Sequence, residues 1–270
     1  MMGKEIRLGK LFSGGENAVV VAADHGEFDG PLPGMINLPE VLKAVPPQVD
    51  GVLLSPGMLP HCGHVFNYKG APLPIVRLNW NSVYSFHWGY KEAVGASALR
   101  AAEAVAHGAE IALVSLTLKT GSEANDARNV GLFCKLSEEA HRLGLPVIGE
   151  FFPPEAEELP PEELQEQVYT GCRIITELGA DLIKTFHTAA FHRVTEAVPV
   201  PILALGASKL PKESQALALA RRAIDEGARG VVFGRNVLQA KNPTRFVLAL
   251  CDVVKREADP NETAAKYQLE

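Results

Sequence analysis

Lys184 is the residue whose type and position point most directly to chemistry. It lies in the short segment ADLIKT (180–185), whose composition is typical of a buried strand. Burial disfavours the ammonium form and lowers the pKa of a lysine, and a neutral amine can attack a carbonyl carbon to form a Schiff base. Such a lysine can equally pair with a carboxylate in the core or point to solvent, so its position alone leaves both roles open.

Two turns that contain glycine follow the next two apolar runs. The first reads GASK (206–209) and the second begins GR (234–235). Glycine lets backbone amides approach a ligand closely, and clustered amides can cradle a phosphate. Glycines also simply end strands, but two such turns near a lysine at a strand end form a more specific pattern. The candidate substrate-binding residues are therefore Gly206, Ala207, Ser208, Gly234 and Arg235.

Other polar side chains stand at the ends of further apolar runs. Asp24 and His25 follow the first run, Glu150 lies in the fifth, and His187 comes three residues after Lys184. Asp24, Glu150 and His187 are candidates for moving protons, and His25 is a candidate for contacting substrate.

Histidines also raise the alternative of a metal site, because zinc can polarise a carbonyl group. The possible ligands are His61, Cys62 and His64, with His25, His187 and His192 from other loops. Since there is no HExxH motif and no paired-cysteine spacing, we expect no metal and no other cofactor.

The elements that carry these residues repeat one pattern, a short apolar run followed by a helix-like stretch. The runs are continuous rather than alternating, as expected for parallel strands covered on both faces. The eight runs are Ala18–Ala23, Gly51–Ser55, Pro74–Asn79, Glu110–Leu116, Pro146–Phe151, Ala180–Thr185, Val200–Leu205 and Arg229–Gly234. The clearest predicted helices are Lys91–His107, Glu123–Leu143, Glu162–Leu178, Lys212–Glu226 and Pro243–Ala258.

This alternation predicts an α/β fold, a single-domain (βα)8 TIM barrel over residues 1–270 with 259–270 as a polar C-terminal tail. A doubly wound open sheet is the competing fold, but no GxGxxG follows the first run and no P-loop motif occurs. In a barrel the active site forms at the C-terminal strand ends, where the candidate residues would meet.

Composition and charge argue against several classes of protein. The chain has 270 residues, 47% of them hydrophobic and 21% charged, which excludes a disordered protein. Its net charge of −6 argues against a broad nucleic-acid-binding surface. No run approaches the length of a membrane span, and no signal peptide is evident. The four cysteines form no CxxC pair, so we expect reduced thiols and a cytoplasmic protein.

Four segments carry a resemblance to a known family: ADHG (23–26), GADLIKT (179–185), LGASK (205–209) and EGARGVVFGRNVLQ (226–239). The chain resembles the archaeal-type class I fructose-bisphosphate aldolases and their DeoC/LacD-like relatives, including autoinducer-phosphate-processing lyases. The resemblance implies a (βα)8 fold, a Schiff base at Lys184, phosphate binding at the Gly206 and Gly234 loops, and Asp24 near the reacting sugar. It also implies a homo-oligomer, such as a pentamer or a decamer of pentameric rings.

The sequence departs from this family at the expected acid/base. Family members often carry a tyrosine before a proline at the end of strand five, where this chain has Phe152-Pro153. Residues two apart share a strand face, so Glu150 is our replacement candidate, unless it is a structural partner for a lysine or arginine of the barrel. His187 stands where relatives often have a tyrosine and is the second candidate, although it can also be a solvated or capping residue.

An aromatic loop follows the third strand: Trp80, Tyr84, Phe86, His87, Trp88 and Tyr90. It can serve as a wall over the substrate or as a subunit contact.

The predicted reaction is the cleavage or formation of a phosphorylated ketose through a Schiff base, giving a product similar to dihydroxyacetone phosphate and an aldehyde. The alternatives are a thiolase-type acyl transfer on a phosphorylated diketone, a metal-dependent aldolase and a non-catalytic phosphosugar-binding protein.

Overall fold

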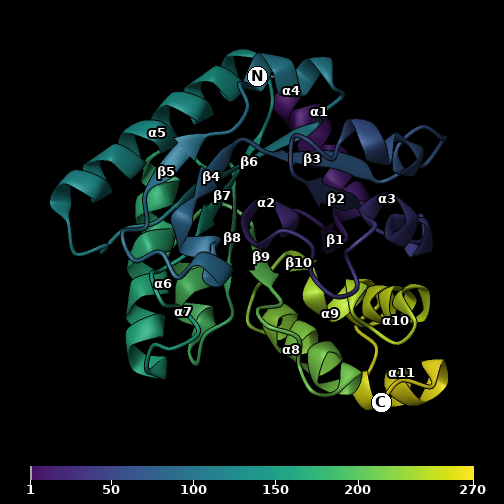
Figure 1. Ribbon diagram of the computed structural model, residues 1–270. Coiled ribbons are helices and arrows are strands. Elements are labelled where there is room, and N and C mark those ends of the chain that lie inside the picture. Colours follow the sequence, from purple (N-terminus) through teal and green to yellow (C-terminus); the bar gives the residue numbers. More distant parts are fainter. Residues whose placement is uncertain (1) are drawn as a thin grey trace.

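The computed structural model describes residues 2–270, and its centre is a closed barrel of eight parallel strands (Figure 1). The barrel strands are β1 (Ala18–Ala22), β2 (Gly51–Leu54), β3 (Leu73–Arg77), β6 (Ile111–Leu116), β7 (Val147–Phe151), β8 (Leu182–Phe186), β9 (Ile202–Leu205) and β10 (Gly230–Phe233). They follow one another round the barrel in chain order, and β10 pairs with β1 to close it. The eight predicted strands and the TIM-barrel fold are confirmed.

Helices lie around this barrel and across its two ends (Figure 1). They are α1 (Met2–Leu11), α2 (Gly26–Asp29), α3 (Leu38–Val41), α4 (Ala101–Ala106), α5 (Glu123–Arg142), α6 (Pro161–Glu177), α7 (Phe191–Glu196), α8 (Glu213–Asp225), α9 (Arg235–Leu238), α10 (Pro243–Lys255) and α11 (Pro260–Tyr267). Short 3₁₀ helices are η1 (Ser13–Gly15), η2 (Leu42–Ala44), η3 (Pro60–Val65), η4 (Ser82–Tyr84) and η5 (Phe86–Trp88). Side-chain caps begin two of the long helices: Ser122 caps α5 and Asn242 caps α10.

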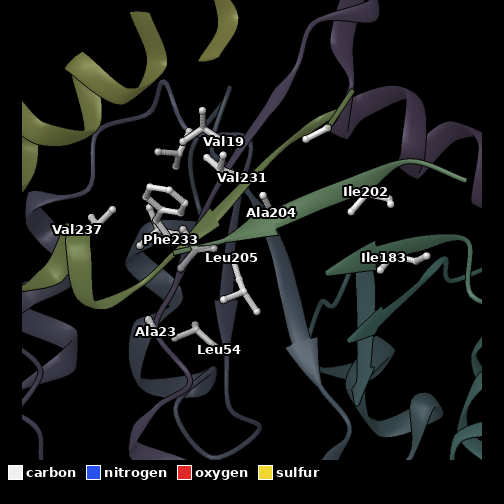
Figure 2. Close-up of a cluster of buried hydrophobic side chains, with 14 of the residues drawn as sticks. Val19, Ala23, Leu54, Ile183, Ile202, Ala204, Leu205, Val231, Phe233 and Val237 are labelled. Carbon is white, nitrogen blue, oxygen red and sulfur yellow. The ribbon is translucent and has the colours of Figure 1, made fainter. Parts of the chain in front are cut away.

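The barrel strands are mostly apolar because both of their faces are buried, and their few buried charged side chains are Arg77, Glu150 and Lys184. Residues such as Val20 and Leu53 pack in one cluster, and Leu11 of α1 joins them. Residues on the opposite strand faces, among them Val19, Ile183 and Val231, pack in a second, larger core (Figure 2). In Figure 2, Val237 lies beside Phe233 at the end of β10.

Helix α1 covers the N-terminal end of the barrel. The Arg7 guanidinium donates to the carbonyl oxygen of Gly144, just before β7, at 3.1 Å. Lys10 pairs with Glu110, just before β6, at 3.1 Å. The opposite end, where the strands finish, is left for the loops that carry the polar candidates.

One predicted helix is wrong over most of its length. Of the stretch Lys91–His107, only α4 is helical, while residues 95–97 form strand β5 (Gly95–Ser97). This strand pairs with β4 (Asn79–Asn81) in a small antiparallel sheet. The backbone amide of Gly95 also donates to the Asn129 side chain at 2.9 Å. These tertiary partners outweigh the helix propensity of the local sequence.

The C-terminal stretch that we expected to be a polar tail contains a packed helix, α11. Asp259 caps it, and its Lys266 and Tyr267 side chains both donate to Asp252 of α10, at 2.7 and 2.9 Å. The Glu270 carbonyl accepts a hydrogen bond from Ser214 at 2.8 Å. None of the helices in residues 2–270 has the length and hydropathy of a membrane-spanning segment.

Candidate active site

A small cavity of about 80 Å³ lies at the C-terminal ends of the barrel strands. Nine residues on different strands and loops give it a polar lining: Asp24, His25, Asp29, Arg77, Tyr84, Glu150, Glu157, Lys184 and Arg235. Phe28, Phe86 and Phe152 supply aromatic walls, and Gly206, Ala207 and Gly234 supply backbone. Most of the candidates from separate parts of the sequence therefore meet in one place.

Lys184 lies in this cavity and is only 6% exposed. Its Nζ is 2.5 Å from Oε1 of Glu150, because strands β7 and β8 pair in the register that sets these two residues side by side. Glu150 therefore has the role that we kept as the alternative, a partner for a basic residue of the barrel. That role and an acid/base role are compatible, since the carboxylate contacts the amine directly.

Arg77, at the end of β3, links the two buried carboxylates. It donates to Oδ2 of Asp24 at 2.7 Å and to Oε2 of Glu150 at 2.5 Å. Burial alone would raise the pKa of both carboxyl groups, but the charges of Arg77 and Lys184 outweigh it and hold each pKa below its usual range. The four groups form a buried cluster of two acids and two bases.

Tyr84, in η4, completes this cluster from the third-strand loop. Its hydroxyl donates to Oε2 of Glu150 at 2.8 Å. Its ring packs between Phe28 and Phe152, with centroid distances of 4.8 and 4.6 Å. Burial and the neighbouring Glu150 raise the pKa of this phenol well above 10, so it stays protonated.

His25 stands between this cluster and the two glycine turns. Its Nδ1 is 3.9 Å from Asp24, and burial lowers its pKa to about 4, so the ring is neutral at neutral pH. A Cβ atom at Gly234 would come within 2.2 Å of the His25 ring, so only glycine fits there. This close approach explains one of the two glycines that the sequence pattern singled out.

The turn at Gly206 keeps an unusual backbone conformation. Ala207 has a φ of +50°, which costs roughly 1 kcal/mol for a residue with a Cβ. The Asn236 side chain holds this turn by donating to the Gly206 carbonyl at 2.7 Å and accepting from the Leu210 amide at 2.8 Å. Ala207, in the GASK turn, therefore has a backbone conformation that glycine adopts more readily.

Glu157, in the loop after β7, lies at the rim beside these turns. Its carboxylate accepts a hydrogen bond from the Arg235 guanidinium at 3.0 Å and another from the Ser208 hydroxyl. Two candidate phosphate ligands are thus engaged by a carboxylate from the protein itself.

One catalytic candidate lies outside this cavity. His187 is absent from the cavity lining and instead pairs with Glu226 at 3.3 Å, packed against the ring of Phe191. Among the described residues, no three His, Cys, Asp or Glu side chains are gathered in a way that could hold a metal ion.

Comparison with known proteins places this barrel in a family. The profile of the DeoC/LacD family aldolases matches residues 18–240. The chain belongs to this family. An uncharacterized aldolase of Saccharolobus solfataricus is 32% identical over 97% of this chain and 98% of its own. A 3-hydroxy-5-phosphonooxypentane-2,4-dione thiolase of Photorhabdus laumondii is 29% identical over 99% of this chain and 86% of its own.

A solved structure has the same fold. It is an archaeal fructose-1,6-bisphosphate aldolase with its catalytic lysine covalently bound to the carbinolamine intermediate of its substrate. It is 24% identical, with a TM-score of 0.76 over 93% of this chain and 99% of its own. Family membership makes the protein described here an aldolase-type enzyme, a carbon–carbon lyase.

Sequence reasoning missed three residues of this aldolase's site: Arg77, Tyr84 and Glu157. For Arg77 a signal existed, because a lone arginine in the apolar run Pro74–Asn79 requires a buried acidic partner. Tyr84 was named only as part of an aromatic loop. In that loop Tyr84 is 7% exposed while Trp88 is 65% exposed, and no spacing rule distinguishes them.

Proposed function

We propose that this aldolase cleaves and forms a phosphorylated ketose through a Schiff base at Lys184. The observation that carries the proposal is the buried Lys184 amine, held 2.5 Å from Glu150 at the strand ends of the barrel. Glu150 can accept the proton that the ammonium must lose before the amine attacks the ketone carbon. Addition gives a carbinolamine, and loss of water gives a protonated imine on Lys184.

The imine then acts as the electron sink. A base removes the proton of the hydroxyl group next to the bond that breaks, and the carbon–carbon electron pair moves towards the imine nitrogen. An aldehyde leaves, and an enamine of dihydroxyacetone phosphate remains on Lys184. Protonation of the enamine carbon and addition of water release the ketone product. Asp24 and Glu150 supply negative charge beside the cationic imine, which stabilises it.

Phosphate binding is proposed at the rim. The backbone amides at Gly206, Ala207 and Gly234 supply donors, and Arg235 and Ser208 supply a charge and a hydroxyl. A phosphate there takes the place that the Glu157 carboxylate now has, because both groups accept hydrogen bonds from the same donors. His187 has no part in this proposal, since it lies with Glu226 outside the cavity lining.

Product analysis tests the reaction. The aldolase is incubated with a panel of ketose monophosphates and bisphosphates, and aldehyde and dihydroxyacetone phosphate are measured. Lys184→Met is expected to abolish cleavage, while Lys135→Met, at an exposed position of α5, is expected to leave it unchanged. Cleavage that survives in Lys184→Met and is lost to a chelator would overturn the Schiff-base proposal.

A second candidate function is thiolase-type acyl transfer, favoured by the likeness to the Photorhabdus laumondii thiolase along 99% of this chain. It uses the same lysine chemistry on a phosphorylated diketone. The two are separated by adding a thiol: if turnover of 3-hydroxy-5-phosphonooxypentane-2,4-dione requires the thiol and yields a thioester, the enzyme is an acyl transferase. If only ketose phosphates are cleaved, with no need for a thiol, it is an aldolase in the strict sense.

A further inference from the structure

The proposed reaction moves two protons that Lys184 does not carry, one from a substrate hydroxyl and one to the enamine carbon. The cavity offers few uncharged groups for this work. The ring of Phe152, at the end of β7, has no proton to transfer, and Asp24 is held by Arg77 at 2.7 Å. Tyr84 is the phenol among the lining residues, and it comes from a different strand end, the loop after β3.

The position of Tyr84 is fixed by local structure and packing. Asn81 caps η4 by accepting a hydrogen bond from the Val83 amide at 3.0 Å, which sets the loop. The ring lies against Phe152 and Phe28, and the Arg77 guanidinium lies 5.0 Å from the ring centroid. The hydroxyl therefore has little freedom to leave the cavity.

One carboxylate connects this hydroxyl to the reactive amine. Glu150 accepts from the Tyr84 hydroxyl at Oε2, at 2.8 Å, and contacts Lys184 Nζ at Oε1, at 2.5 Å. Such a contact suits a relay, in which the phenol oxygen accepts a proton from substrate while its own proton passes to the carboxylate.

We propose that Tyr84 is a catalytic residue that relays protons between the substrate and Glu150; this inference rests on the proposed Schiff-base reaction. In cleavage, the substrate O–H proton goes to the Tyr84 oxygen, and the Tyr84 proton goes to Oε2 of Glu150. The electron pair of the O–H bond forms the aldehyde C=O, and the carbon–carbon pair forms the enamine. The relay then runs in reverse: Glu150 returns its proton to Tyr84, and Tyr84 protonates the enamine carbon.

The electrostatics of the cluster fit a relay rather than a free phenolate. The raised pKa of Tyr84 disfavours any step that leaves the phenol ionised, and a relay never does so. Glu150 is held ionised by two neighbouring cations. As the bond breaks, the positive imine becomes a neutral enamine, so Glu150 loses one of these cations and becomes more basic at the moment when it receives the proton.

Hydrogen exchange at carbon measures this step without a complete turnover. Dihydroxyacetone phosphate is incubated with the enzyme in D₂O, and deuterium at the carbon next to the ketone is followed by NMR. Tyr84→Phe removes one oxygen atom and is expected to slow exchange about 10²- to 10⁴-fold, the range of general acid–base catalysis. Borohydride trapping of the Lys184 imine is expected to stay within about threefold of wild type, because imine formation does not need the phenol.

Tyr90→Phe is the matched control. Tyr90 lies in the same loop but is 53% exposed and does not line the cavity, so its variant is expected to exchange at the wild-type rate. Undiminished exchange in Tyr84→Phe would overturn the relay. Equal loss of imine trapping and exchange in a folded Tyr84→Phe would also overturn it, because Tyr84 would then only support Lys184.

A second variant keeps the test valid if Tyr84→Phe does not fold. Trifluorotyrosine at position 84 retains the ring and hydroxyl but makes the phenol more acidic. Exchange is then expected to fall at a pH where the wild-type rate is still constant, and a profile that matches wild type would overturn the relay. Failure of wild type to form any imine is a different result, because it removes the proposed function itself rather than the role of Tyr84.

Discussion

The cavity contains two carboxylate–base clusters that differ in burial. In the inner cluster, Glu150 is 1% exposed and contacts Arg77, Lys184 and Tyr84. In the rim cluster, the Glu157 side chain is 35% exposed and contacts Arg235 and Ser208. Because their burial differs, these two sets of carboxylate–cation pairs differ in how much they stabilise the fold. A buried pair costs several kcal/mol to disrupt, whereas a partly exposed pair contributes roughly 0–1 kcal/mol and can exchange with a ligand.

We interpret the inner cluster as a fixed set of reacting groups and the rim cluster as an exchangeable binding site. The loop after β7 carries Glu157, and strand β7 carries Glu150, so one segment supplies both carboxylates. The difference lies in their surroundings, and three changes probe it.

The largest expected effect comes from removing one of the two cations of the inner cluster, Arg77. Arg77→Met leaves Asp24 and Glu150 buried with one fewer positive charge, and it is expected to lower the free energy of unfolding by about 3–5 kcal/mol at pH 7. Arg235→Met is the matched change at the rim, with an expected loss below about 1 kcal/mol. Urea unfolding followed by circular dichroism measures both. Equal losses at the two sites would remove the distinction between the clusters.

His25, between the two clusters, is expected to make stability depend on pH. Its pKa is about 4 in the folded protein against 6.5 for an ordinary histidine. Between these two pH values His25 is therefore protonated in the unfolded chain and neutral in the folded one. The contribution of neutral His25 to the free energy of unfolding is complete above about pH 6.5 and is lost as the pH falls towards 4. Between pH 7 and 5 the free energy of unfolding is expected to fall by up to about 2 kcal/mol from this residue.

The control for this pH effect uses a histidine on the surface. His25→Gln is expected to flatten the dependence of unfolding free energy on pH between 7 and 5, whereas His107→Gln, at an exposed position, is expected to leave it as in wild type. If His25→Gln and wild type lost the same stability over this interval, a half-buried, neutral His25 would be ruled out.

The smallest expected effect is at the rim. Glu157→Gln removes the negative charge that competes for Arg235 and Ser208, so the affinity for inorganic phosphate is expected to rise about three- to tenfold, or roughly 1 kcal/mol. Isothermal titration calorimetry at low ionic strength measures it. Glu158→Gln, in the same loop and exposed, is the control with no expected change. Weaker phosphate binding in Glu157→Gln would mean that Glu157 supports the site rather than competes for it.

Much of the architecture could be predicted because it depends on local patterns. Each barrel strand is a mostly apolar run between glycine or proline turns, and predicted and observed strand ends differ by at most two residues. The predicted helix Lys91–His107 failed because residues 95–97 pair with residues 79–81, a partnership that local propensity does not reveal. The helical C-terminus likewise depends on Asp252, which accepts from Lys266 and Tyr267.

The candidate site also combines residues that local sequence patterns predict with residues that only tertiary packing places. Lys184, Asp24 and Glu150 stand at strand ends, so a barrel brings them together once its strands are known. Tyr84 reaches the cavity through a capped 3₁₀ turn in a loop. That Tyr84 is buried there, while Phe86 and Trp88 stay exposed, depends on packing against Phe28 and Phe152. His187 failed to reach the cavity because the loop after β8 pairs it with Glu226.

The central claim, an imine on Lys184, is tested most directly by trapping it. The aldolase is incubated with dihydroxyacetone phosphate, reduced with borohydride, digested and analysed by peptide mass spectrometry, with Lys184→Met as the control. We expect a reduced adduct on the peptide that contains Lys184 and none in the Lys184→Met variant. An adduct on another lysine, or no adduct while cleavage of a ketose phosphate proceeds, would contradict it.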